Sequence, residues 1–142
     1  MESQIRFTLL VAAALYMGWG LSLLLAPGVS HSLISNGPYD PVTTIMFGAA
    51  MIGTMIMFII AAYDPEREIV RASAVSLAVV GFTAAYLIFI AKVMPLGPLT
   101  VISLLVDLGA CGLLFLMEAR MDLRDQKKKP RRAATSVRRR RA

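Results

Sequence analysis

Residues 93–117 have the sequence VMPLGPLTVISLLVDLGACGLLFLM, in which Asp107 is the only charged residue. A hydrocarbon core about 30 Å thick needs roughly 20 apolar residues of helix to cross it. The stretch supplies that length. It therefore predicts a membrane-spanning helix with a single carboxyl group near its middle.

The rest of the chain repeats this pattern before the tail begins. Three further stretches contain no Asp, Glu, Lys or Arg, and they cover residues 7–39, 41–63 and 72–91. We therefore predict an all-α fold, an integral membrane four-helix bundle. The predicted spans lie near residues 5–26, 41–62, 66–92 and 98–119. They form a transmembrane domain over residues 1–119, and a basic cytoplasmic tail follows over residues 120–142.

The composition supports a membrane protein and excludes several kinds of site. Of the 142 residues, 57% are hydrophobic and the mean hydropathy is +0.67, which is well above the range of soluble domains. A single Cys excludes an internal disulfide and a thiol-pair redox site. A single His excludes haem ligation by two histidines and argues against a zinc site within one chain. The sequence predicts no catalytic residue, no cofactor and no metal site.

Local signals mark where the spans begin. The apolar run Phe7–Ala26 is longer than the apolar region of a signal peptide and ends without an A-x-A site, so we expect it to remain as the first span. Proline is favoured at the first position of a helix, and an Asp before it can accept hydrogen bonds from free backbone amides. The later spans are expected to open at Asp40-Pro41, Asp64-Pro65 and Gly97-Pro98.

Basic residues predict the orientation, because cytoplasmic loops carry an excess of Lys and Arg. With four spans, the N-terminus, the connection around Arg67 and Arg71, and the tail share one side. That side holds all of the fifteen Lys and Arg residues except Lys92. We therefore expect both termini in the cytoplasm and the chain in a bacterial-type inner (plasma) membrane.

Polar side chains of the fourth predicted span fall along one helical face. They recur at spacings of three, four, four and seven residues, at Thr100, Ser103, Asp107, Cys111 and Glu118. Complementary polar groups come from the third span (Ser76, Thr83, Tyr86) and the first (Tyr16, Trp19, Ser22). The predicted buried or functional polar set is Asp107, Ser103, Cys111, Thr83 and Tyr86.

An acid near the bilayer midplane is costly. Insertion scales put a central Asp at about 2.5–3.5 kcal/mol, so Asp107 should face the bundle interior or water. No basic residue is expected at matching depth, and desolvation then favours the neutral form of a carboxyl group. Three roles stay open for Asp107: a hydrogen-bonding contact between helices, pairing with a group of another subunit, or handling of an ion, proton or ligand.

The tail is dense in positive charge. We predict disorder from residue 120, because like charges repel and apolar residues are few. A basic segment beside a membrane helix attracts anionic lipid by about 1 kcal/mol per residue. Nucleic-acid binding is disfavoured because no aromatic residues are interleaved for stacking, and docking to an acidic partner is a further alternative. The predicted lipid-binding residues are Lys127, Lys128, Lys129, Arg131, Arg132, Arg138, Arg139, Arg140 and Arg141.

Two weaker patterns lie elsewhere in the chain. The connection at residues 27–40 carries His31, Tyr39 and Asp40, and we expect an ordinary turn there, with a small polar site or a metal site shared across subunits as the alternative. Small residues mark close helix contacts in lipid. Such residues pair at Ala14 with Gly18, Ala49 with Gly53, and Gly109 with Gly112. We expect packing within the bundle, with a dimer seam left open.

Three features resemble a known group of proteins. The first span closes on Leu24-Leu25-Ala26-Pro27, the second contains GAAMIG at residues 48–53, and a charged turn covers Asp64–Arg71. In these features, over roughly residues 8–119, the chain resembles the small four-span bacterial inner-membrane proteins grouped as DoxX-like. The resemblance implies a four-helix membrane bundle, in some cases associated with redox partners, and transfers no catalytic residue.

From these observations we expect a non-enzymatic membrane protein. It would act as an accessory subunit of a larger complex or as a small homo-oligomer, with Asp107 as a buried polar contact and the tail on anionic lipid. The alternative is a small proton-coupled or cation-coupled carrier in which Asp107 alternates between protonated and ligand-bound states. An enzyme is disfavoured because the sequence places no pair of titratable groups at a reacting distance.

Overall fold

Each uncharged stretch folds into at least one helix, because a helix satisfies its own backbone hydrogen bonds without help from solvent. A computed structural model describes residues 2–139, with side chains described up to residue 121. Within these residues the helices are α1 (Glu2–Leu25), α2 (Pro27–Ile34), α3 (Pro41–Tyr63), α4 (Arg67–Phe89) and α5 (Pro98–Arg139). The described residues form no strand. The all-α prediction is confirmed.

Four helices are long and apolar enough to cross a membrane. They are α1, α3, α4 and the Pro98–Met121 part of α5. Their bounds agree with the predicted spans to within a few residues. The agreement reflects the simple rule behind the prediction, since charge-free runs of this length have no other stable conformation in lipid.

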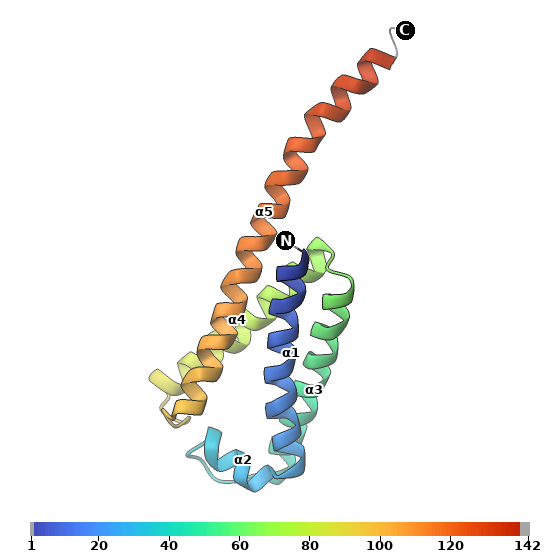
Figure 1. Cartoon of the computed structure of the whole chain (residues 1–142). Helices are drawn as coiled ribbons and strands as arrows, with labels where there is room; N and C mark the ends of the chain where they lie inside the picture. The colour runs from blue at the N-terminus through green and yellow to red at the C-terminus, as the bar shows by residue number, and fades with distance from the viewer. Residues whose placement is uncertain (1, 140–142) are drawn as a thin grey trace.

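The helices alternate in direction, and α2 lies across one end of the bundle (Figure 1). Helix α1 packs mainly against α3, and α4 packs mainly against α5, while α1 and α5 join the two pairs. The N-terminus lies at the end where α5 leaves the bundle, which we call the terminal end; the opposite end is the α2 end (Figure 1). At the α2 end, the backbone N–H of Asn36 donates to the carbonyl oxygen of Val93 at 2.9 Å and joins two connections.

The packed core fills the half of the bundle nearer the terminal end. Its fully buried side chains include Ile5, Leu9, Phe58, Leu77 and Leu114, which come from all four long helices. Lipid tails are as apolar as these side chains, so association in a membrane depends on close van der Waals contact rather than on hydrophobicity. The shape of this core therefore determines how the helices meet.

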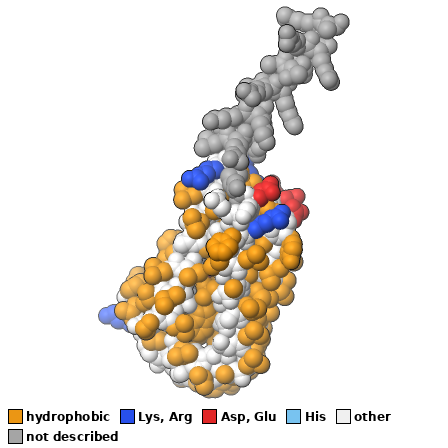
Figure 2. All heavy atoms as spheres, in the orientation of Figure 1, with side chains coloured by type: hydrophobic (Ala, Val, Ile, Leu, Met, Phe, Trp, Pro, Cys, Tyr) orange, Lys and Arg blue, Asp and Glu red, His pale blue; other side chains and the backbone are white. Residues whose placement is uncertain are grey.

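The outer surface of the bundle is apolar. Large exposed hydrophobic side chains occur on every long helix, for example Phe7, Ile60, Phe82 and Leu105. Figure 2 shows apolar side chains over most of the visible face, with most of the visible charged side chains near the end where α5 leaves the bundle. An apolar surface this extensive indicates contact with lipid or with other proteins.

Two glycines bring α1 and α3 close together. A Cβ atom on Gly20 would lie 2.8 Å from Cδ1 of Ile52 and 3.1 Å from the carbonyl oxygen of Gly48. A Cβ atom on Gly48 would lie 2.9 Å from Cβ of Leu23 and 3.1 Å from the carbonyl oxygen of Gly20. A side chain at either position would therefore crowd the contact between α1 and α3.

The small residues singled out from the sequence do not form these contacts. A Cβ atom at Gly18, Gly53, Gly109 or Gly112 would meet no packing neighbour within 4 Å. All four glycines are exposed. The prediction that they mark packing within the bundle is wrong, because spacing alone does not identify which face of a helix points inward.

The predicted helix starts are correct at two of three positions. The Asp40 side chain accepts hydrogen bonds from the backbone amides of Val42 and Thr43 at the start of α3, and α5 begins at Pro98. Asp64, however, ends α3, and its backbone N–H donates to the carbonyl oxygen of Ile60 at 3.2 Å. Asp64 is thus the residue that follows α3, and Glu66 is the residue that precedes α4, which begins at Arg67.

The connection after the first span is more regular than expected. An ordinary turn was predicted for residues 27–40, but α2 occupies Pro27–Ile34 with proline in its first turn. Proline at that position has no N–H to leave unpaired and holds a helical φ. Residues 35–40 then form the link to α3.

Helix α5 extends well beyond its membrane-length part. In contrast to the predicted disorder from residue 120, the helix continues to Arg139. Residues 120–139 are mostly Lys, Arg, Ala and Gln, which favour helices, and they extend a helix that is already nucleated. Among the predicted lipid-binding residues, Lys127 to Arg139 lie beyond the described side chains, and Arg140 and Arg141 lie outside the described residues altogether.

Candidate functional site

A cavity of about 270 Å³ lies between the helices in the half of the bundle nearer α2. Its walls are mainly apolar, with side chains such as Leu15, Ile34, Met51, Leu87 and Leu104 from all five helices. Six polar or amphipathic side chains also line it: Tyr16, Trp19, Thr83, Thr100, Ser103 and Asp107. An apolar cavity with a few polar groups is typical of small-molecule sites, although this one is just below their usual range of about 300–1,000 Å³.

Asp107 lies where the packed core ends and the cavity begins. Its side chain is 5% exposed, and the hydroxyl of Tyr16 donates a hydrogen bond to its Oδ1 at 3.2 Å. The Tyr16 ring packs edge-on against Phe58, with ring centroids 5.3 Å apart. This contact with α3 therefore holds the Tyr16 ring in place beside the carboxyl group on α5.

Gly81 makes room for this carboxyl group on the α4 side. A Cβ atom on Gly81 would lie 3.0 Å from Oδ2 of Asp107 and 2.6 Å from Cδ2 of Leu108. Sequence reasoning missed this residue. The available signal was that Gly81 is the only glycine in the charge-free stretch 72–91.

Two shielded polar atoms among the lining residues have no hydrogen-bond partner within the described residues. They are Oδ2 of Asp107 and Oγ1 of Thr100, and the Thr100 side chain is also 5% exposed. An unsatisfied buried polar group costs about 1–3 kcal/mol. Both residues lie on the α5 face that borders the cavity. A molecule inside the cavity could therefore supply the hydrogen-bond partners that both atoms lack.

A second contact between α1 and α5 lies one turn from Asp107. The indole N–H of Trp19 donates to Oγ of Ser103 at 2.9 Å. Tyr16 and Trp19 therefore both meet the polar face of α5, as the sequence predicted for the first span. Ser22 does not join them, because its hydroxyl is exposed and donates to the carbonyl oxygen of Gly18.

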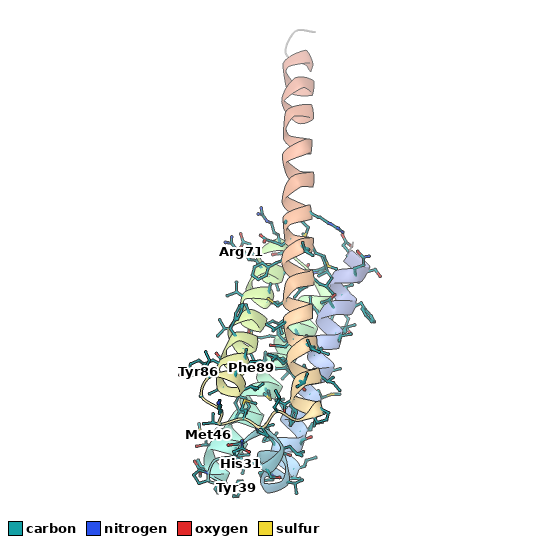
Figure 3. The ribbon with its side chains drawn as sticks, turned by 90° about the vertical axis from the view of Figure 1, so that its left-hand side faces the viewer. His31, Tyr39, Met46, Arg71, Tyr86 and Phe89 are labelled. Carbon is teal, nitrogen blue, oxygen red and sulfur yellow. The ribbon has the colours of Figure 1, made fainter. Side chains whose placement is uncertain are left out.

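The structure brings together most of the predicted polar set. Asp107, Ser103 and Cys111 lie on the inward face of α5, where Cys111 packs into the core rather than the cavity. Thr83 lines the cavity from α4. Tyr86 does not join them and is 52% exposed. It is three residues beyond Thr83, about 60° around the helix, and it lies on the outer side of the bundle (Figure 3).

The cavity wall is open to the exterior on the side of α3 and α4. Among its lining residues, Phe47 of α3 is 47% exposed and Val79 of α4 is 61% exposed. Thr83 is exposed as well. These two helices make few contacts with each other. In a membrane this opening would face lipid, and we call it the lateral opening.

A smaller hollow of about 200 Å³ lies at the α2 end. Its polar lining residues are His31, Asp40, Thr43 and Thr44, and it shares Leu23, Ile34 and Phe47 with the main cavity. The His31 and Tyr39 rings pack edge-on with centroids 5.4 Å apart. Both residues are labelled in Figure 3. No group of three or more His, Cys, Asp or Glu residues within the described part of the chain is placed to hold a metal.

Asp40 beside this hollow is engaged in capping α3. Hydrogen bonding from the Thr43 hydroxyl, from the backbone amides of Val42 and Thr43, and attraction to His31 hold the pKa of this exposed carboxyl below its ordinary value of 3.8. Both of its oxygens accept hydrogen bonds. The main role of the Asp40 carboxylate is therefore to cap the N-terminus of α3.

Comparison of the chain with protein-family models, with curated proteins and with solved structures finds no match.

Proposed function

We propose that this is a multi-pass protein of a bacterial-type inner membrane, with both termini in the cytoplasm, that binds a small molecule inside its helix bundle. Four membrane-length helices and an apolar exterior support the location. The distribution of Lys and Arg supports the orientation. In this orientation the cavity lies in the outer half of the membrane.

One observation carries the ligand-binding role. Asp107 and Thr100 border an apolar cavity, and each holds a buried polar atom without a hydrogen-bond partner among the described residues. A purely structural acid would use both carboxyl oxygens on neighbouring helices, since an unmet acceptor in lipid is costly. A ligand with hydrogen-bond donors would satisfy both atoms.

We further propose that binding is coupled to a proton, so that the protein acts as a small carrier. The titratable side chains that interact electrostatically with Asp107 are Tyr16 of α1 and Cys111 of α5. The lining residues from α3 and α4 are Phe47, Met51, Val79, Val80, Thr83, Ala84 and Leu87, none of which titrates. With no cation in the lining, a bound proton neutralises the carboxyl group, and a ligand cation would replace that proton.

Trp19 allows a direct test of cavity occupancy. It is the only tryptophan of the chain, and it lines the cavity, so its fluorescence reports events at the site. The protein is placed in lipid nanodiscs and titrated with hexylamine, 1-hexanol and hexanoate. We expect a saturable change in emission with at least one of these probes.

Matched variants show whether the signal comes from the cavity. Ala84 lines the cavity and its neighbour Ala85 does not, although both are half-buried. Ala84→Leu should abolish the saturable change by filling the cavity, whereas Ala85→Leu should leave it unchanged. If no probe gives a saturable change, or if Ala84→Leu has no effect, the ligand-binding role is wrong.

Proton coupling is tested in vesicles that contain a pH-sensitive dye. A probe that binds the wild-type protein should carry a proton flux in the opposite direction. Asp107→Asn retains the shape and the hydrogen-bonding capacity of the side chain but cannot exchange a proton. It should remove the flux while the purified protein keeps its helicity. Equal flux in the variant would exclude the carrier mechanism.

A role as an accessory subunit or small homo-oligomer is the second candidate. The exposed glycines Gly18 and Gly53, where a Cβ atom would meet no packing neighbour, leave room on the outer surface for another helix. We propose that such contacts, together with lipid binding by the basic tail, would anchor the protein in a complex. The resemblance to the DoxX-like group, some of whose members associate with redox partners, is part of this second proposal.

Purification in mild detergent tests the second candidate. Stoichiometric partners or a defined oligomer that is lost in Gly18→Leu or Gly53→Leu would support it. A monomer by light scattering, unchanged in both variants, would exclude it.

A further inference from the structure

We propose that the cavity takes an amphiphilic amine, whose ammonium group binds Asp107 beside the rings of Tyr16 and Trp19 and whose apolar chain runs along the cavity toward Thr100. The inference rests on the proposed ligand-binding function and names the class of ligand. It is carried by four features of the cavity: its charge, its aromatic rings, its length and its opening.

The charged and hydrogen-bonding groups of the lining favour a cation. Asp107 is the only charged residue that lines the cavity. Tyr16 already donates to Oδ1 of Asp107, so the carboxyl group acts as an acceptor there. Oδ2 has no partner among the described residues, and a ligand N–H that donates to it in place of the proton would leave the carboxyl group accepting at both oxygens, as the ionised form does. Its natural partner is therefore a group that brings a positive charge and N–H donors, and a ligand carboxylate would be repelled.

Aromatic side chains flank the same position. Tyr16 and Trp19 are three residues apart, and residues at this spacing lie on one face of a helix. Both line the cavity, and both donate hydrogen bonds to the α5 face that carries Asp107. The faces of tyrosine and tryptophan rings attract ammonium groups, most strongly where water is excluded. An acid with two such rings suits an amine better than an alcohol.

The second unpartnered atom defines the length of the ligand. Thr100 precedes Asp107 by seven residues on α5, which is two helical turns or about 10 Å along the axis. Between them the lining is mostly apolar, with Val80, Leu87 and Leu104, and the Ser103 hydroxyl is already engaged by Trp19. A short alkyl chain fits this interval. A second polar group at its far end would meet the Thr100 hydroxyl.

The remaining features restrict the ligand further. The lateral opening connects the cavity to the lipid phase, where an amphiphile concentrates. The volume of about 270 Å³ is too small for a two-chain phospholipid, given that drug-sized ligands need about 300–1,000 Å³. A hard metal cation is a poor fit, because Mg²⁺ and Ca²⁺ require at least about six oxygen ligands and the lining is mostly apolar.

A head-group series tests the inference. Hexylamine, 1-hexanol and hexanoate share one alkyl chain and differ only in the head group. In phosphatidylcholine nanodiscs, with Trp19 emission as the readout, we expect hexylamine to bind at least tenfold more tightly than 1-hexanol, and hexanoate to give no saturable signal. In the filled-cavity variant Ala84→Leu, any remaining change in Trp19 emission measures how much of the signal comes from partition of the probe into lipid.

Two variants connect this preference to named groups. Asp107→Asn should reduce the affinity for hexylamine to that for 1-hexanol. Tyr16→Leu retains the acid but removes one of the two rings, so it should weaken binding of the amine more than binding of the alcohol, which provides a test even if the first variant does not fold. In a second comparison, 6-amino-1-hexanol should bind more tightly than hexylamine to the wild type, and Thr100→Val should remove that advantage.

The outcomes separate the two levels of the proposal. If 1-hexanol binds as tightly as hexylamine, or if both variants retain the amine preference, the ligand class is wrong while the binding function stands. If none of the probes gives a saturable signal that Ala84→Leu abolishes, the binding function fails and this inference fails with it. A tenfold amine preference that depends on Asp107 supports both.

Discussion

Gly20 of α1 and Gly48 of α3 lie face to face, so that a Cβ atom on either residue would be 3.1 Å from the carbonyl oxygen of the other. On each helix the opposing atom is a backbone carbonyl oxygen. Backbone cannot yield as the end of a flexible side chain can. This contact therefore sets how closely the first pair of helices approaches.

Alanine at either of these glycines should destabilise the protein. In Gly20→Ala and Gly48→Ala the new methyl group overlaps the opposite helix, and overpacking of this kind costs about 1–3 kcal/mol. The midpoint of thermal unfolding, followed by circular dichroism in detergent, should fall for both variants.

The same substitution at exposed glycines provides the control. At Gly18 and Gly53 a Cβ atom would meet no packing neighbour within 4 Å, and alanine favours a helix over glycine by up to about 1 kcal/mol. Gly18→Ala and Gly53→Ala should leave the midpoint unchanged or raise it. A loss as large as that at Gly20 would contradict the assignment of the contact faces.

Removal of the Tyr16 hydroxyl should destabilise the folded protein, whereas removal of the Tyr63 hydroxyl should not. Tyr16→Phe leaves Oδ1 of Asp107 without its hydrogen-bond donor, and an unsatisfied buried acceptor costs about 1–3 kcal/mol. Tyr63 is 78% exposed, so Tyr63→Phe should have no measurable effect. Equal unfolding midpoints for the two variants would indicate that the Tyr16–Asp107 contact contributes nothing to stability.

The cap at the start of α3 should make stability depend on pH at the acidic end. Hydrogen bonds, first from the Thr43 hydroxyl, lower the pKa of Asp40 in the folded protein below its ordinary value of 3.8. A lowered pKa in the folded state means that the stabilisation is fully present above the ordinary value and is lost as the pH falls through the lowered one. At neutral pH the wild type should therefore unfold at a higher temperature than Asp40→Ala.

This difference should shrink when Asp40 is protonated. Unfolding midpoints measured from neutral pH down to about pH 2 should converge for the wild type and Asp40→Ala. Asp64→Ala is the comparison, because Asp64 ends α3 and has no capping role for α4. A difference between the wild type and Asp40→Ala that persists at the lowest pH would mean that the ionised cap is not its source.

Cysteine labelling in intact cells should distinguish the two ends of the bundle. In a Cys111→Ser background, Ser32→Cys lies on α2 and Ser3→Cys lies near the start of α1, and both positions are exposed. A reagent that does not cross membranes should label position 32 in intact cells, and position 3 only after the membrane is opened. Labelling of both positions in intact cells would contradict the proposed orientation.

The sequence was sufficient to predict the long helices and the polar face of α5. A charge-free run fixes where a span can lie, and a polar residue in lipid has to point inward, so the 3.6-residue period indicates the buried face without further information. Thr100, Ser103, Asp107 and Cys111 are accordingly buried or half-buried. The partners Tyr16 and Trp19 followed from the same argument.

The contacts between helices were harder to predict because they depend on rotation about each helix axis. In a helix that is apolar all round, periodicity does not distinguish the face at Gly20 from the face at Gly18. For the same reason Tyr86 was expected inside and lies outside, about 60° from Thr83. The Asp-Pro pair is also ambiguous, since Asp40 directly precedes α3 whereas Asp64 directly follows it.

The division of the bundle into pairs has a consequence for how the protein is made. Helices α1 and α3 pack mainly against each other, and both are complete at Tyr63. In the membrane location proposed above, this hairpin can therefore assemble before the remaining spans are translated. Tyr16 belongs to this hairpin, whereas its hydrogen-bond partner Asp107 lies 91 residues later in the chain. In that proposed setting, the Tyr16 hydroxyl is already in position when Asp107, the one charged residue of the stretch 93–117, is translated.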